Sequence, residues 1–331
     1  MGGRMNENEA NETGFDEGSG LGAQHLRARI AWYYYVAGLT QQEISERLGI
    51  GRVRVNRIVG QLRADGSVVV DIRLPLVSCV ELEERLKKAF GLKAVAVVPS
   101  VADDEQQRRM LGDAAGALLD DLIADAKCVS IGWGRTLSAS IRRMRERRLP
   151  NCAVVSLMGG LTRGSETNTF EVSTELAKTL GAECYYLTAP VYSPSPESRE
   201  ILLTHSGVNE VMARAQAADL AIVSCGDLTP RTKLTTIRSV QQRLPELSRC
   251  GAIGEILGTF IDAAGRPVDH ALNRSVIALP PSDLRAANNS LLVSGGQHKA
   301  EVISAVLAAQ YVNGLVTDED VAKFVLARHG G

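Results

Sequence analysis

Residues 39–72, LTQQEISERLGIGRVRVNRIVGQLRADGSVVVDI, decide the fold of the first part of this chain of 331 residues. Thr40 and Glu43 have the spacing of a capping box, in which each side chain accepts a hydrogen bond from the backbone amide of the other residue. Leu39 and Ile44 stand at the positions of a hydrophobic staple, which fixes how the chain enters a helix. The pattern therefore predicts a helix that begins after Thr40 and a tight turn at Gly49.

A second helix is predicted over residues 52–64, because hydrophobic residues recur there at helical spacing. These residues are Val55, Ile58, Val59 and Leu62. Asp65 and Gly66 then turn the chain, and we interpret residues 68–72 as a strand of a β-wing. A further helix is predicted before these two helices, at residues 24–37. This order of elements is typical of a small, winged helix-turn-helix domain that binds DNA.

The residues that reach DNA in such a domain lie mainly at the start of the second helix, which enters the major groove. Arginine pairs with guanine there and asparagine with adenine. The candidate DNA-binding residues are Thr40, Gln41, Arg52, Arg54, Asn56, Arg57 and Arg63. Residues 24–74 carry eight arginines against four acidic residues, although the whole chain has a net charge of -1. This local basic charge favours operator DNA as a partner over the alternative of a merely solvated helix face.

The rest of the chain divides by composition and pattern. Residues 1–22 are rich in Gly, Asn and Glu and are predicted to be a disordered tail. The helix-turn-helix domain is placed at 23–75, a linker helix at 76–91 and an effector domain at 92–331. In the effector domain, helices alternate with short apolar strands predicted at 94–98, 129–132, 153–158, 184–187, 220–224, 276–278 and 291–293. This alternation predicts an α/β effector domain with a mostly parallel sheet.

Several classes of site are not expected. The six cysteines form no C-x-x-C pair and no histidine clusters with them, so we expect no metal site and reduced, structural thiols. No hydrophobic run has the length of a membrane span, and we expect a cytoplasmic protein that does not bind membranes. No cofactor is expected either.

Glycine-rich turns follow three predicted strands, at residues 132–134, 159–160 and 295–296. Glycine lets backbone amides approach an anion closely, and a helix N-terminus adds partial positive charge. The candidate effector-binding residues are Gly132, Gly134, Arg135, Thr136, Gly159, Gly160, Asn168, Glu255, Asp262, Gly295, Gly296 and Lys299. The alternative is a set of ordinary tight turns with basic residues on the surface, and loop or capping roles for Asn168, Glu255 and Asp262.

Residues 24–331 resemble the SorC family of bacterial sugar-responsive regulators, which includes the deoxyribonucleoside and central glycolytic gene regulators. The resemblance rests on the helix-turn-helix stretch and on the later motifs IGWGRTL, MGGLT, GAIGEILGTFIDAAG and SGGQHKAEVISAVL. It implies an effector domain similar to the phosphosugar isomerase and deaminase fold, phosphosugar or polyol effectors, and a homo-oligomer, either dimer or tetramer. By position in the motifs, Gly134, Arg135, Thr136, Gly160 and Lys299 would hold the phosphate.

The chain departs from this family at three places. Gly51 stands where serine is usual, so the second helix lacks a side-chain N-cap. Ser45 stands where alanine is usual. Residues 224–227, SCGD, differ from a more glycine-rich pattern, which leaves open an unphosphorylated effector.

We therefore expect a DNA-binding transcriptional regulator of a carbohydrate or polyol catabolic operon, controlled by a sugar phosphate, a sugar or a polyol, and not an enzyme. One alternative is a sugar-phosphate isomerase or deaminase with an appended N-terminal domain. It requires a general base, for which Glu255 and Asp262 are candidates, but no paired acid and base motif is present. A third hypothesis is a module whose helix-turn-helix binds another protein, and the salt dependence of DNA binding would distinguish it.

Overall fold

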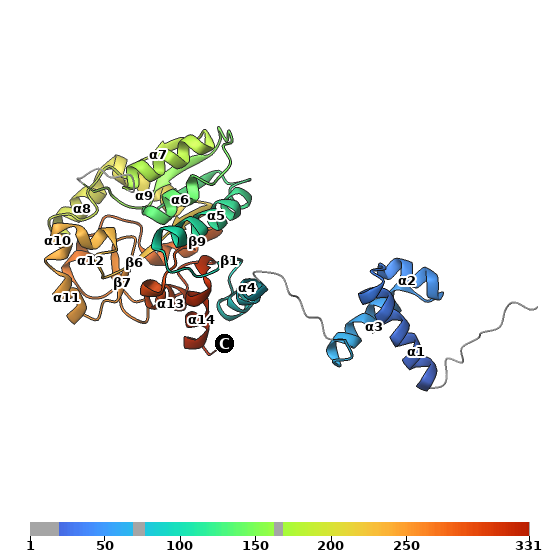
Figure 1. Ribbon diagram of the computed structural model, residues 1–331. Helices are drawn as coiled ribbons and strands as arrows, with labels where there is room; N and C mark the ends of the chain where they lie inside the picture. Colours follow the sequence, from blue (N-terminus) through green and yellow to red (C-terminus); the bar gives the residue numbers. More distant parts are fainter. Residues whose placement is uncertain (1–19, 69–76, 162–167, 331) are drawn as a thin grey trace, which may run out of the picture. The chain divides into compact units, whose positions relative to one another are not determined.

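The computed structural model describes residues 20–68, 77–161 and 168–330 (Figure 1). The chain forms two compact units, with the division between Arg73 and Leu74. Most of the predicted tail at 1–22 and all but the first residue of the predicted wing strand at 68–72 lie outside the described residues.

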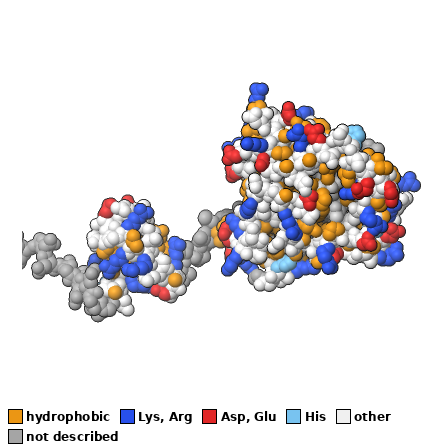
Figure 2. Space-filling model, turned by 180° about the vertical axis from the view of Figure 1, so that it is seen from behind, with side chains coloured by type: hydrophobic (Ala, Val, Ile, Leu, Met, Phe, Trp, Pro, Cys, Tyr) orange, Lys and Arg blue, Asp and Glu red, His pale blue; other side chains and the backbone are white. Residues whose placement is uncertain are grey.

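The smaller unit is helical. It consists of α1 (Gly20–Ala31), a one-turn π-helix η1 (Trp32–Val36), α2 (Gln41–Leu48) and α3 (Arg52–Ala64). Because α1 begins at Gly20, the last residues of the predicted tail are helical, and the single helix predicted at 24–37 changes to π-helical geometry at Trp32. On the face seen in Figure 2, Lys and Arg side chains gather on this unit, whereas both signs of charge are mixed on the larger one.

The core of the smaller unit is built from the predicted hydrophobic faces. Its buried residues are Ile30, Ile44, Val55, Ile58, Val59 and Leu62. The capping box at the start of α2 is present: the amide of Thr40 donates to Oε2 of Glu43 at 2.7 Å, and the amide of Glu43 donates to Oγ1 of Thr40 at 3.3 Å. Gly49 ends α2 with a φ of 64°, a left-handed conformation that favours glycine.

The larger unit is an α/β domain. Its central sheet has the order β1-β10-β9-β5-β2-β3-β4, and every neighbouring pair is parallel. The strands are β1 (Ala94–Val98), β2 (Cys128–Ile131), β3 (Ala153–Ser156), β4 (Glu183–Tyr185), β5 (Leu220–Val223), β9 (Asn289–Val293) and β10 (Gly314–Asp318). The predicted mostly parallel sheet is confirmed. The strand predicted at 276–278 is wrong, because these residues form only isolated bridges with Tyr192 and Met158, and β10 was not predicted.

A second, antiparallel sheet was also not predicted. It contains β6 (Cys225–Asp227), β7 (Gly254–Ile256) and β8 (Thr259–Ile261). Leu257 and Gly258, which join β7 to β8, both have positive φ, as a tight hairpin turn of this length favours. The hairpin holds Glu255 at a fixed place beside β6.

Helices cover both faces of the central sheet (Figure 1). The helices of the larger unit are α4 (Val77–Phe90), α5 (Asp104–Leu122), α6 (Arg135–Ile141), α7 (Thr169–Leu180), α8 (Pro196–Thr204), α9 (Ser206–Gln216), α10 (Arg238–Gln241), α11 (Leu244–Arg249), α12 (Ala271–Ser275), α13 (Ala300–Ala308) and α14 (Glu319–Arg328), with short 3-10 helices η2 (Lys233–Thr236), η3 (Pro281–Ala286) and η4 (Gln297–Lys299). Successive strand residues, such as Val154 and Val155, belong to different hydrophobic clusters, as the alternation of side chains along a strand requires.

Helix α4, predicted as a linker, is part of the larger unit. Cys79, Leu82 and Leu86 on one of its faces are buried, and they belong to the same hydrophobic cluster as residues of β1 and α14. The helix is therefore held by its own hydrophobic face against the domain that follows it.

Helices α5 and α6 approach each other closely through two glycines. A Cβ atom on Gly116 would lie 2.8 Å from the carbonyl oxygen of Ser140 and 2.9 Å from Cβ of Arg143, and one on Gly112 would lie 3.0 Å from Cβ of Ala139. These contacts pack the middle of α5 against the C-terminal end of α6.

We predict that Gly116→Ala destabilises the larger unit by about 1–3 kcal/mol, because the added methyl group overpacks this contact. Gly207→Ala is the matched control, since Gly207 is also helical and a Cβ there would make only ordinary contacts at 3.6 Å with His205. Urea unfolding of the larger unit measures both changes, followed by the fluorescence of Trp133 with Trp32 replaced by phenylalanine. Equal stability of the two variants would contradict this account of the packing.

Candidate functional site

A pocket in the larger unit lies where three neighbouring strands end. Strands β9, β5 and β2 are adjacent and parallel, so their carboxyl ends meet at one edge of the sheet. The turns after these strands supply residues 133–136, 224–226, 295–296 and 298–299 to the pocket wall. Ligands of parallel α/β sheets bind at this edge.

The turn after β9 is held in place by a carboxylate. Oδ2 of Asp318 accepts from the amide of Gly296 at 2.6 Å, and Oδ1 accepts from the hydroxyl of Ser100 at 2.9 Å. A Cβ on Gly295 would lie 2.5 Å from Oδ2 of Asp318, and Gly296 has a φ of 95°. Both positions therefore require glycine, one for close approach and the other for its backbone conformation.

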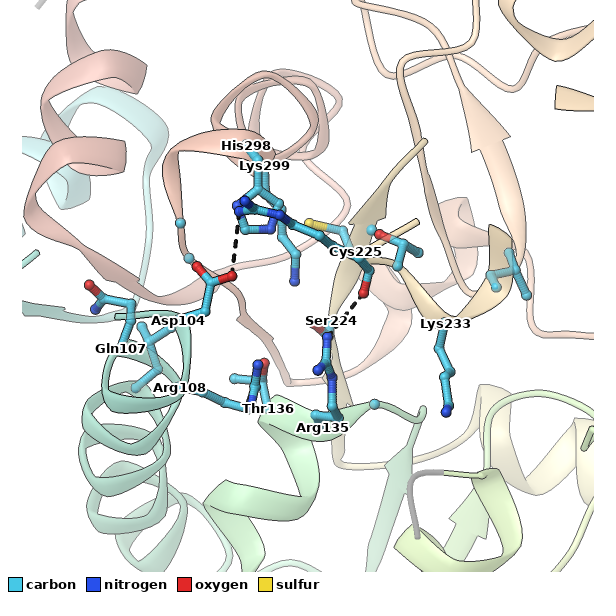
Figure 3. A pocket seen from close by; sticks show the side chains of 18 of the residues that line it. Asp104, Gln107, Arg108, Arg135, Thr136, Ser224, Cys225, Lys233, His298 and Lys299 are labelled. Carbon is cyan, nitrogen blue, oxygen red and sulfur yellow. Dashed lines mark hydrogen bonds and ion pairs between the residues drawn. The ribbon is translucent and has the colours of Figure 1, made fainter. Parts of the chain in front are cut away.

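Basic side chains surround the pocket from different elements (Figure 3). They are Arg108, Arg135, Arg231, Lys233 and Lys299. The carboxylates that line the same space are those of Asp104 and Glu255. The excess of positive charge, together with the amides of the glycine turns, creates a potential that attracts an anion.

An ion pair crosses the pocket. Nη1 of Arg231 lies 3.4 Å from Oδ2 of Asp104, and Nη2 of Arg135 donates to the carbonyl oxygen of Arg231 at 3.0 Å. These contacts connect the segment after β6 to the starts of α5 and α6. By contrast, Nζ of Lys299 has no ion-pair partner within 4.0 Å among the described residues, and its side chain is half-buried.

Glu255 is the buried acid of the pocket. Its side chain is 5% exposed, and Oε2 accepts from the amide of Gly258 at 2.9 Å. The pKa of Glu255 is raised to about 7, mainly by burial and to a smaller extent by the nearby Asp227, against the opposing effects of the hydrogen bond from Gly258 and the charge of Lys299. Near neutral pH, this carboxyl group is therefore able to donate a hydrogen bond as well as accept one.

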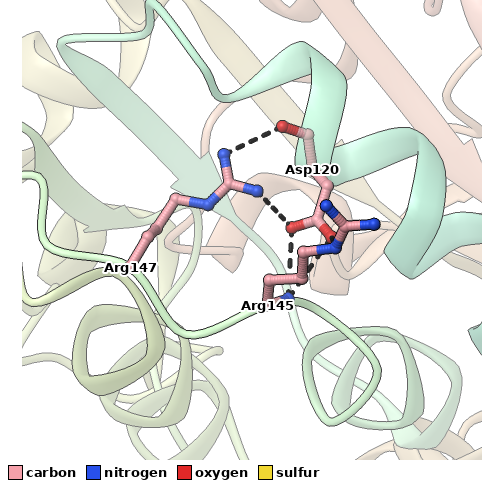
Figure 4. A network of polar contacts seen from close by, with 3 residues as sticks. All are labelled: Asp120, Arg145 and Arg147. Atoms are coloured by element: carbon pink, nitrogen blue, oxygen red, sulfur yellow. Dashed lines mark hydrogen bonds and ion pairs between the residues drawn. The ribbon is translucent and has the colours of Figure 1, made fainter.

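Helix α5 is anchored at its far end by a second charged network (Figure 4). Nη2 of Arg147 donates to Oδ1 of Asp120 at 2.5 Å, and its Nη1 donates to the carbonyl oxygen of the same residue at 2.9 Å. The amide of Arg145 donates to the Asp120 carboxylate at 3.2 Å. The segment after α6 is thus tied to the C-terminal end of α5.

The structure brings most of the predicted effector-binding residues together. Those that line the pocket are Gly134, Arg135, Thr136, Glu255, Gly295, Gly296 and Lys299. Gly132 is not among the lining residues. It stands at the end of β2, where a Cβ would lie 3.2 Å from Leu257.

Four other predicted residues have structural roles away from this pocket. The Asn168 side chain caps α7 and binds the backbone of Leu161. Asp262 accepts from the amides of Ala264 and Arg266, each at 2.9 Å, so it closes a turn. Gly159 and Gly160 allow close chain packing, since Cβ atoms there would lie 2.6 Å from a carbonyl oxygen and 2.3 Å from the ring of Phe170.

The sequence prediction missed two elements of the pocket. Asp104, Gln107 and Arg108 come from the first turns of α5, and Arg231, Thr232 and Lys233 come from the segment after β6. His298, which is not among the predicted site residues, also lines the pocket, where burial and Lys299 lower its pKa. A signal was present in the cluster of polar residues directly after β6, but no strand had been predicted there.

The candidate DNA-binding residues lie on α2 and α3 of the smaller unit. Arg52, Asn56 and Arg57 are exposed, whereas Arg54 is partly buried. Nε2 of Gln41 donates to Oδ1 of Asn56 at 3.3 Å, which connects the two helices. Nε of Arg63 donates to the hydroxyl of Tyr35 at 2.8 Å.

The two departures in the helix-turn-helix have different consequences. The hydroxyl of Ser45 donates to the carbonyl oxygen of Ile50 at 2.6 Å, so this serine fastens the turn between α2 and α3. Gly51 gives α3 no side-chain cap, as expected.

Neither a metal site nor a membrane-spanning helix is found in the described part of the chain. No group of three His, Cys, Asp or Glu residues there is arranged to hold a metal ion. Of the described helices, none is long and hydrophobic enough to cross a membrane.

Comparison with known proteins identifies relatives along almost the whole chain. The family model Sugar-bind, which describes a sugar-binding domain, matches residues 75–327. The erythritol catabolism regulatory protein EryD of Brucella abortus (strain 2308) is 33% identical over 311 residues, which cover 92% of this chain and 98% of that protein. The transcriptional regulator LsrR of Escherichia coli (strain K12) is 34% identical over 314 residues, 93% of this chain and 96% of that protein.

A solved structure shows the same fold. The full-length sorbitol operon regulator SorC from Klebsiella pneumoniae superposes with a TM-score of 0.72 at 24% sequence identity, over 91% of this chain and 98% of that one. At this identity, the likeness supports the arrangement of elements and not a particular ligand.

The pKa of Glu255 predicts how stability depends on pH. The folded chain raises this pKa from 4.5 to about 7, so folding favours the protonated form. The stabilisation from proton binding is complete below pH 4.5 and is lost as the pH rises through 7. Over this window we expect the larger unit to lose on the order of 3 kcal/mol relative to Glu255→Gln.

Urea unfolding at a series of pH values tests this expectation. Glu210→Gln is the control, because it removes an acid from the exposed surface of α9. If Glu255→Gln retains the full pH dependence of the parent chain, the raised pKa is wrong.

Proposed function

The chain belongs to the SorC family of transcriptional regulators with a sugar-binding domain, and from this premise we propose that a sugar phosphate or polyol in the pocket of the larger unit controls operator binding by α3. Its relatives along almost the full length are regulators, and the alternative of an isomerase or deaminase is not supported. The observation that carries the proposal is the convergence of Arg135, Thr136 and Lys299 on one pocket.

The ligand is proposed to bind with its anionic end near Lys299. This lysine and the backbone amides at the start of α6, directly after Gly134, offer donors to phosphate oxygens, and basic side chains around them add long-range attraction. The hydroxyl groups of the ligand would then reach Glu255, whose carboxyl group can donate as well as accept near neutral pH. A polyol without phosphate would rely on the contacts between its hydroxyl groups and Glu255 alone.

The DNA contact is proposed to combine contacts to base edges with contacts to phosphates. Arg52 and Arg57 are exposed at the start of α3, where such a helix meets base edges. Arg63, which lies over the ring of Tyr35 and is fixed by its hydroxyl, retains further N–H groups for a phosphate. The capping box of Thr40 and Glu43 stabilises the start of α2, the first helix of the helix-turn-helix.

We also propose that the regulator acts as a homo-oligomer in the cytoplasm, where operator DNA is found. A two-fold assembly would read two half-sites one helical turn or a multiple apart.

Mobility-shift titrations with DNA from upstream of the neighbouring operon test the proposed control of operator binding, with erythritol, sorbitol, their phosphates and inorganic phosphate as effectors. If no ligand changes the operator affinity, the proposal that a ligand controls operator binding is wrong.

Two variants are expected to separate the activities of the two units. Lys299→Ala removes a donor from the pocket and should weaken ligand affinity at least about tenfold, since charged hydrogen bonds contribute about 1.5–3 kcal/mol. Operator affinity without ligand should not change. Trp133 lines the pocket, so its fluorescence, with Trp32 replaced by phenylalanine, reports ligand binding. The matched control is Lys323→Ala on α14, which removes an exposed lysine paired with Glu319.

Arg57→Ala should have the reverse effect. We expect a loss of about 1–3 kcal/mol in operator binding and relaxed sequence preference, with ligand affinity retained. Arg57→Lys keeps the charge but not the planar fork, so it should retain non-specific binding and lose sequence preference. If Arg57→Ala and Lys299→Ala damage both activities equally, the proposed division of labour is wrong.

A further inference from the structure

An exposed valine stands at the beginning of α3. Val53 is 84% exposed, the highest fraction among the large hydrophobic residues that the described part of the chain leaves on its surface. The other valines, the isoleucine and the leucine of the same helix are all buried. The packing of the smaller unit therefore does not account for a hydrophobic, β-branched residue at this position, where alanine would favour the helix more.

Val53 belongs to the outermost line of α3. Residues of an α-helix advance by about 100° each, so Val53, Arg57 and Gly60 fall on one line at spacings of four and three. This line runs opposite the buried face that contains Val55 and Leu62. If α3 docks on another molecule with its exposed side, this line of residues is therefore the part of the helix closest to that molecule.

Gly60 is a second residue on this line that the chain itself does not require. It lies inside α3, where glycine destabilises a helix relative to alanine. A Cβ there would have nothing within 4 Å, and Gly60 does not have a positive φ. Neither packing nor backbone conformation within the protein therefore explains glycine at this position.

We propose that Val53 packs against the C5-methyl group of a thymine in the major groove of each operator half-site, with Gly60 giving α3 the clearance to lie that deep. The proposal rests on the proposed function, in which α3 enters the groove. The thymine methyl is the apolar group that the major groove offers to a hydrophobic side chain.

The surroundings of Val53 favour DNA over a protein surface. Arg52 and Arg54 flank it in sequence, and Arg57 stands one turn further along the same face. A second copy of the chain docked here would bring these like charges together, which is unfavourable. A DNA groove instead supplies phosphates for the arginines and a methyl group for the valine.

The test compares thymidine with deoxyuridine, which differs from it only in lacking the C5-methyl group of the base. Full-length chain first selects its operator from random duplexes, and each thymine of one half-site is then replaced singly. For the parent chain we expect one replacement per half-site to weaken binding about fourfold, which corresponds to one buried methyl group at roughly 0.8 kcal/mol. Val53→Ala should bind both duplexes equally and about as weakly as the parent chain binds the uridine duplex.

Val36→Ala is the matched control, because Val36 is also an exposed valine of the smaller unit, at 69%, but lies on η1. It should keep the full difference between thymine and deoxyuridine. If every replacement affects the parent chain and Val53→Ala by the same factor, the inference is overturned while the proposed function stands. If the parent chain selects no specific duplex, the proposed function fails, and the inference fails with it.

Gly60→Ala gives an independent measurement. The substitution should raise the melting temperature of the smaller unit, since alanine favours the helix, and at the same time lower operator affinity. Higher stability with unchanged operator affinity would show that α3 does not lie close to DNA along this line, and would overturn the inference.

Discussion

The parallel pairing of β9, β5 and β2 is the constraint on which the larger unit depends. Parallel strands must all return to the same edge through a crossover, so the turn after each strand ends at the same place. Residues that are more than 150 positions apart in the sequence, such as Arg135 and Lys299, thereby meet around one pocket. The antiparallel hairpin of β7 and β8 closes the pocket with the buried Glu255.

The walls of this pocket are held by contacts that tolerate little change. Gly112 and Gly116 bring α5 against α6, and Asp120 binds Arg147 at the far end of the same pair. Asp318 fixes the turn that precedes Lys299. The ligand-facing cations can therefore be preorganised, which reduces the ordering cost of binding. The ion pair between Arg231 and Asp104 is exposed, so an anion bound as proposed would compete with Asp104 for Arg231.

Local chemistry explains what the sequence could and could not predict. The capping box of Thr40 and Glu43 and the periodic face of α3 are local signals, and both elements form where predicted. The three glycine turns marked strand ends, but the roles of Gly159 and Gly160 depend on chains that approach from elsewhere in the fold. Arg108 and Arg231 were missed because neither lies in a glycine turn, and only the tertiary structure brings them to the pocket.

The central claim is that ligand binding in the larger unit and operator binding by the smaller unit are energetically coupled. Titration calorimetry of one effector, against the free chain and against the chain bound to its operator, tests this most directly. The account predicts two different effector affinities, whose ratio equals the factor by which the same effector changes operator affinity. Equal effector affinities for the free and the operator-bound chain would contradict it.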